Sequence, residues 1–77
     1  MTMTRAESLS LVFDLAFSYM RAPDGSAREE NVRHALNNAR VAALALGCPL
    51  PTVDRAEIRG LTAGQGGTED SQFGGES

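Results

Sequence analysis

The chain has 77 residues, which sets one small domain as its upper limit and leaves room for only a modest hydrophobic core. Its net charge of −3 disfavours nonspecific binding to nucleic-acid phosphates, and its single cysteine excludes an intrachain disulfide. The sequence has no secretory-signal pattern and no apolar run long enough to cross a bilayer, so we expect a cytoplasmic protein that does not bind membranes.

The first predicted helix covers residues 5–21 and begins at the capping box Thr4-Arg5-Ala6-Glu7. Its apolar side chains cover about 240° of the helical wheel, whereas a surface helix usually needs a stripe somewhat wider than about 100°. Because two further short helices offer little cover, we expect part of this arc to contact another protein or a second copy of the chain. The predicted contact residues are Leu11, Val12, Leu15 and Tyr19.

A turn at Ala22-Pro23-Asp24-Gly25 separates this helix from a longer second one. A second capping box, Ser26-Ala27-Arg28-Glu29, opens that helix, which we expect to reach Leu46. Gly47 then occupies the position at which many helices end in the left-handed conformation.

The second helix carries an alanine-rich apolar stripe about 120° wide. Small side chains allow two helices to approach closely, so this stripe is expected to face Phe13, Phe17 and Met20 of the first helix. The short turn between the two helices favours an antiparallel hairpin.

A linker at Cys48-Pro49-Leu50-Pro51 leads to a short third helix, capped by Thr52 or Asp54 and ending near Gly60. From residue 62 the composition is Gly, Ser, Thr, Gln and acidic residues, which cannot bury enough apolar surface to offset the entropy lost on ordering. We therefore predict an all-α protein: an antiparallel helical hairpin plus a short third helix in a mini-domain of residues 1–61, followed by a disordered, flexible acidic tail of residues 62–77.

No set of residues predicts catalysis, so we expect a protein that is not an enzyme and holds no metal or cofactor. His34 is the only histidine, and Glu30 lies one turn before it, as in an ordinary solvated helix pair. Cys48 follows the carboxyl end of a helix, where the helix dipole disfavours a reactive thiolate.

Two alternative functions use the polar side of the second helix. Arg33 and Arg40 lie on one flank and, with Tyr19, could hold a small phosphate-bearing ligand such as a cyclic nucleotide. The competing interpretation is a pair of solvated charges, with Arg33 balanced by Glu29. A helix-turn-helix-like nucleic-acid binder is the second alternative, but the acidic balance and the acidic start of the second helix argue against it.

Several features between residues 17 and 61 lie in a suggestive order. They are Phe17-Ser18-Tyr19, the turn Ala22-Pro23-Asp24-Gly25, the alanine-rich helix, and Cys48-Pro49 before another short helix. This order resembles the opening of phage helical-hairpin proteins that sequester cyclic nucleotides. The resemblance implies that Tyr19 and Arg33 are candidates for base stacking and phosphate contact.

The sequence thus predicts a small protein-interaction protein that forms a homo-oligomer or binds another protein through its first helix. An inhibitor, an adaptor or an assembly subunit fits this description, and the size of the chain fits a phage or mobile-element origin.

Overall fold

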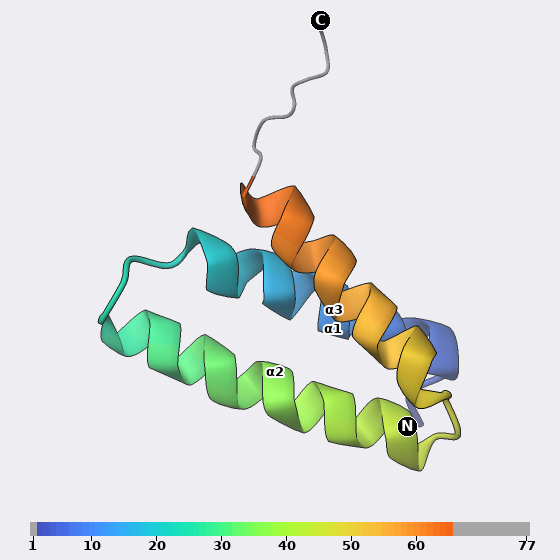
Figure 1. The fold of residues 1–77 in the computed structure, drawn as a ribbon. Helices are drawn as coiled ribbons and strands as arrows, with labels where there is room; N and C mark the ends of the chain where they lie inside the picture. Colours follow the sequence, from blue (N-terminus) through green and yellow to red (C-terminus); the bar gives the residue numbers. More distant parts are fainter. Residues whose placement is uncertain (1, 66–77) are drawn as a thin grey trace, which may run out of the picture.

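The computed structural model describes residues 2–65, and their regular structure consists of three helices (Figure 1). The helices are α1 (Arg5–Arg21), α2 (Ala27–Ala45) and α3 (Leu50–Gln65). The predicted all-α class is therefore confirmed. Residues 66–77, most of the predicted tail, lie outside the described residues. None of these three helices combines the length and apolar character needed to cross a lipid bilayer.

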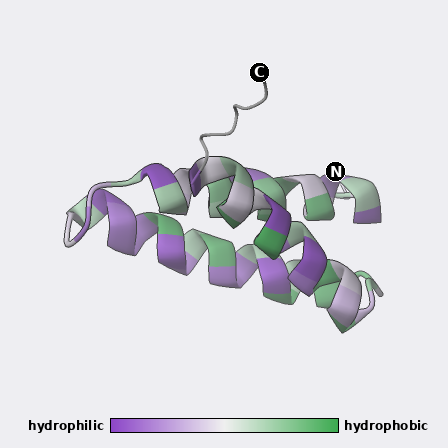
Figure 2. Cartoon of the chain, turned by 45° about the horizontal axis from the view of Figure 1, so that its top comes forward, coloured by the Kyte–Doolittle hydropathy of each residue, from purple (hydrophilic) through white to green (hydrophobic). Residues whose placement is uncertain are grey.

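The central element of the fold is α1, because α2 and α3 each pack against it and scarcely touch one another. α1 and α2 run in roughly opposite directions, while α3 crosses α1 and diverges from α2 toward its carboxyl end (Figure 1). Figure 2 shows hydrophobic and hydrophilic residues along every helix, with the first half of α2 mostly hydrophilic. The helix with the widest apolar arc therefore has neighbours on two sides.

Side-chain caps determine where α1 and α2 begin. At α1 the predicted capping box is complete: the Thr4 N–H donates to Glu7 Oε1 at 2.9 Å, and the Glu7 N–H donates to Thr4 Oγ1 at 3.1 Å. At α2 only half of the predicted box forms, since the Glu29 N–H donates to Ser26 Oγ at 3.0 Å but the Glu29 carboxylate accepts from Gly25 at 2.8 Å. The Ser26 N–H already donates to a carbonyl oxygen of the preceding turn at 3.2 Å, which explains the change of partner.

The end of α2 agrees with the prediction to within one residue. Gly47 has a φ of +98°, in the left-handed region where glycine is favoured. Its N–H donates to the Leu44 carbonyl oxygen at 3.0 Å, and the Cys48 N–H donates to the Ala43 carbonyl oxygen at 3.0 Å. This pair of bonds is a Schellman motif, which satisfies carbonyl groups that the helix leaves unpaired.

α3 begins earlier than predicted, because Leu50 and not Thr52 or Asp54 is its first residue. The carbonyl oxygen of Pro49 accepts two backbone N–H groups of the new helix, at 3.0 and 3.1 Å. Pro51 lies in the first turn, where an N–H group would have no partner within the helix, so it does not interrupt the structure. The second half of the predicted linker is therefore helical.

α3 also ends later than predicted. It continues through Gly60 and Leu61 to Gln65, so residues 62–65, assigned to the tail from composition, belong to the helix. Local propensity disfavours glycine inside a helix by about 1 kcal/mol relative to alanine. Tertiary packing outweighs that preference here, because Gly60 and Gly64 are both buried.

The two glycines lie where α3 meets α1. A Cβ atom added to Gly60 would lie 2.4 Å from the carbonyl oxygen of Phe13, and one added to Gly64 would lie 2.8 Å from Met20 Cβ and 2.9 Å from the Phe17 carbonyl oxygen. The flat surface of α3 therefore lies against the backbone of α1 at Phe13 and Phe17 and against the Met20 side chain, whereas the sequence predicted the alanine stripe of α2 opposite these residues. Close approach of two backbones is the physical reason for glycine at both positions.

Two small clusters of buried side chains form the core. The first joins all three helices and contains Val12, Ala16, Leu36 and Ala39, with Leu15, Ala56 and Leu61 packed against it. The second lies near the α2–α3 connection and contains Ala43, Cys48 and Val53, with Leu9 packed against it. Alanine and valine dominate both clusters, so the helices approach closely but bury few large side chains.

Candidate functional site

The predicted contact residues of α1 do not form one continuous exposed surface. Val12 is fully buried in the core, Leu15 is half-buried against it, and Tyr19 is half-buried. Leu11 is the predicted contact residue that remains exposed, at 37%. The prediction that Val12 is available to a partner is therefore wrong, because side chains of α2 and α3 pack over the part of the apolar arc that contains Val12, while Leu11 and Phe17 of the same arc stay exposed.

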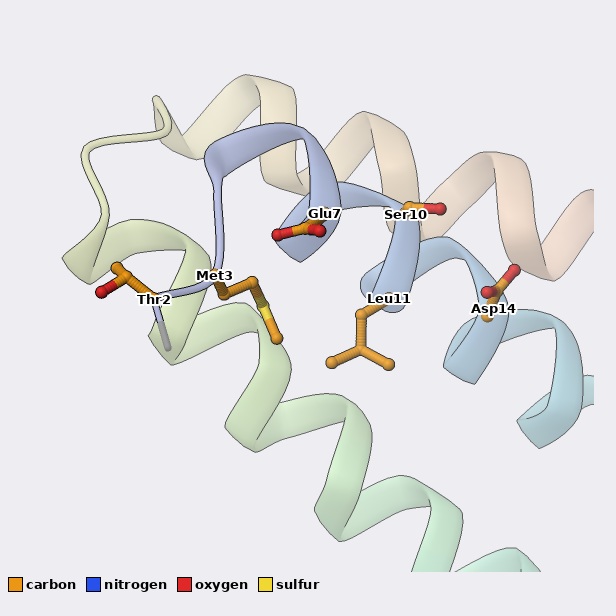
Figure 3. A pocket seen from close by; sticks show the side chains of 6 residues that line it. All are labelled: Thr2, Met3, Glu7, Ser10, Leu11 and Asp14. Carbon is orange, nitrogen blue, oxygen red and sulfur yellow. The ribbon is translucent and has the colours of Figure 1, made fainter.

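The exposed Leu11 side chain belongs to a wide, open depression of about 480 Å³ at the start of α1. We call this the Leu11 groove, and its lining residues are Thr2, Met3, Glu7, Ser10, Leu11 and Asp14. Figure 3 shows the side chains of Met3 and Leu11 directed toward the same space, with the carboxylates of Glu7 and Asp14 on the surrounding helix surface. Met3 is 41% exposed, so two apolar side chains and two acidic ones share this surface.

A second groove, of about 410 Å³, lies between α1 and α3. We call this the Phe13 groove, and its lining residues are Leu9, Ser10, Phe13, Thr52, Arg55, Ala56 and Arg59. Arg55 and Arg59 are one turn apart on α3, and both are exposed. Within residues 2–65, neither guanidinium forms an ion pair with a carboxylate.

The two grooves adjoin each other and carry opposite charge. Ser10, on the exposed side of α1, lines both of them. The acidic residues Glu7 and Asp14 line one groove, and the basic residues Arg55 and Arg59 line the other. One side of the molecule therefore presents an acidic and a basic recess, each with apolar walls, separated by α1.

Arg40, which was predicted to bind a ligand, instead forms ion pairs within the protein. Its guanidinium donates to Glu57 Oε1 at 2.7 Å and to Asp54 Oδ1 at 2.5 Å, and so joins α2 to α3. Arg33, the second predicted ligand residue, pairs with Glu30 at 3.9 Å and not with the predicted Glu29. Arg40 thus has its charge balanced by two carboxylates, which weakens its attraction for a phosphate-bearing ligand.

His34 and Cys48, the other side chains with possible reactivity, make contacts that are typical of a structural role. His34 Nε2 lies 3.7 Å from Glu30 Oε2, in the predicted pair on the surface of α2. The Cys48 thiol is buried, and its sulfur lies 3.9 Å from the Ser8 hydroxyl oxygen. Among the residues that the structure describes, no three His, Cys, Asp or Glu side chains gather in an arrangement suited to a metal ion.

No motif in the sequence marks Met3, Arg55 or Arg59 as functional residues. The one-turn spacing of the two arginines indicates a shared face of a helix, which was a usable signal. No local pattern shows that this face lies beside Phe13, because that placement depends on how α3 crosses α1.

Comparisons of the chain with models of protein families, with curated protein sequences and with solved structures find no significant match.

Proposed function

We propose that this protein works by binding another protein chain through the side of α1 that carries the Leu11 groove. The observation that supports the proposal is the exposure of Leu11 and Met3 around a recess, beside a core composed mostly of smaller side chains. Both side chains are already partly covered in the free protein, so a partner that covers them removes only their remaining exposed surface from water and contributes a fraction of the about 1.5–3 kcal/mol of full burial for each. The roles that fit such a contact are those of an inhibitor, an adaptor or an assembly subunit, and the small size of the chain fits a phage or mobile-element origin.

The proposal narrows the contact surface from the whole arc of α1 to its first half. Leu15 packs against the core and Val12 lies within it, so substitutions there test the fold and not the contact. A substitution at Leu11 can weaken binding to a partner without disturbing the fold, because this side chain is exposed. A charged side chain at position 11 can stay in water in the free protein but becomes costly under a partner.

The test places a photo-crosslinking amino acid at Leu11 in the full chain expressed in its native host. The expected result is a discrete crosslinked species of defined mass, which disappears when Met3→Glu is added to the same chain. The matched control carries the crosslinker at Asn38, which is exposed on α2 and lines neither groove, and it should yield no crosslinked species. A Leu11 crosslinker that yields only uncrosslinked protein would contradict the proposal.

A companion experiment compares Leu11→Glu with Leu15→Glu by circular dichroism. We expect Leu11→Glu to keep the helical content of the wild type and Leu15→Glu to lose it, because the second change puts a charge against the core. Loss of helical structure in Leu11→Glu would show that Leu11 serves the fold, and the proposed contact surface would then be wrong.

A further inference from the structure

We propose that the chain bound at this surface is a second copy of the same protein, related to the first by a twofold axis. In this arrangement the Leu11 groove of each copy faces the Phe13 groove of the other. The inference rests on the proposed function, since it names the occupant of the surface that the proposed function assigns to protein binding.

Charge complementarity is the first argument for a second copy. Glu7 and Asp14 line the Leu11 groove with no basic residue, while Arg55 and Arg59 line the Phe13 groove with no acidic residue. Opposite charges at matching positions of an interface favour correct pairing and speed up encounter. The chain as a whole carries a charge of −3, so two copies repel one another in most orientations. Pairing of each acidic groove with a basic groove is the orientation in which local attraction opposes that repulsion.

The position of the grooves is the second argument. Both are lined by Ser10, so they lie on the same side of the molecule, one on each side of the exposed strip of α1. A twofold rotation about an axis passing near Ser10 exchanges the two sides. It therefore brings the acidic groove of one copy over the basic groove of the other, twice in one interface. Interfaces of this isologous kind are the commonest in homodimers.

Apolar side chains supply the third argument. The walls of the two grooves include the exposed Met3 and Leu11 on one side of α1 and the half-buried Phe13 on the other. Pairing the grooves places these apolar side chains against each other and removes their exposed parts from water. The charged residues then lie around an apolar centre, which is the usual anatomy of a protein interface.

The test uses charge reversal in the full chain, with Asp14→Arg for the acidic groove and Arg59→Glu for the basic one. Each variant alone places like charges at both symmetry-related positions of a homodimer. We expect sedimentation velocity to show a wild-type dimer and a dissociation constant raised about tenfold or more for either variant alone.

Mixing the two variants in equal amounts is the decisive step. A heterodimer of Asp14→Arg with Arg59→Glu has opposite charges at both positions, so we expect it to form with an affinity within about threefold of the wild type. Both variants remain acidic overall, so a general attraction between them cannot explain the recovery. The control variants Asp24→Arg and Arg28→Glu carry the same charge changes at exposed positions outside both grooves and should leave the dimer unchanged.

Two outcomes would overturn the inference. One is a wild-type chain that stays monomeric at all accessible concentrations, and the other is a mixture of the two variants that remains as weakly associated as each variant alone. The crosslinking experiment at Leu11 then tests the proposed function independently of self-association. An adduct with a different protein would leave the proposed function standing without self-association, and the absence of any adduct would remove both.

Discussion

Replacement of Gly60 by alanine tests the close approach of α1 and α3 on which the fold depends. The new Cβ atom would lie 2.4 Å from the Phe13 carbonyl oxygen and 2.7 Å from Ala16 Cβ, whereas ordinary contacts of a Cβ atom begin near 3.4 Å. The two helices would have to separate by about 1 Å, because backbone atoms cannot rotate out of the way as a side chain can.

Two opposing effects determine how much Gly60→Ala changes the free energy of unfolding. Alanine improves helix propensity at this position by about 1 kcal/mol. Overpacking of a close interface costs about 1–3 kcal/mol, and separation of the helices forfeits further dispersion contacts along the α1–α3 boundary. We expect a net loss of about 1–2 kcal/mol in the free energy of unfolding, which corresponds to a fall in Tm of at least about 4 °C in a domain of this size. Gly64→Ala should behave in the same way with a smaller effect, because its closest clashes are longer.

The assay is thermal and urea unfolding followed by circular dichroism, with all variants at one protein concentration so that self-association does not alter the comparison. Thr62→Ala is the matched control, since it also raises helix propensity in α3 but lies at an exposed position. It should be neutral or slightly stabilising. A Gly60→Ala variant more stable than the wild type would refute the reasoning, because it would show that propensity decides this position and that α1 and α3 do not touch there.

Two further predictions concern polar and reactive side chains. Arg40→Ala should lower the free energy of unfolding by about 1–2 kcal/mol, because it breaks two charge-assisted hydrogen bonds and leaves the Asp54 and Glu57 carboxylates without their shared cation. Urea unfolding measures this loss. The control is Arg33→Ala, which removes an exposed ion pair and should lower the free energy of unfolding by less than about 0.5 kcal/mol. Equal effects of the two arginine variants would contradict a structural role for Arg40. The Cys48 thiol should react with a chromogenic disulfide reagent at least about tenfold more slowly in the native protein than in denaturant, because it is buried in the second core cluster. Rapid labelling of the native protein would show that this cluster opens readily.

The candidate site was predictable only in part, as Leu11 and Val12 show. Both belong to the apolar arc of α1, and hydropathy alone gives no means of distinguishing them. The structure leaves Leu11 exposed and buries Val12 completely, because the position of α2 decides which side of the arc is covered. The basic side of the proposed interface also depends on helix packing, since Arg55 and Arg59 lie beside Phe13 only because α3 crosses α1.

The sequence by itself determined the helical class, the start of α1 and the end of α2. Thr4, Glu7 and Gly47 act on backbone groups a few residues away, so their effect is legible in any short window of the chain. Tertiary structure alone decided the length of α3 and its choice of partner. Gly60 indicates a helix end when only its neighbours in the sequence are considered, yet it supports a longer helix because it lies against Phe13, far away in the chain. A contact between distant segments changes the balance of free energy at a glycine, and no local pattern contains that contact.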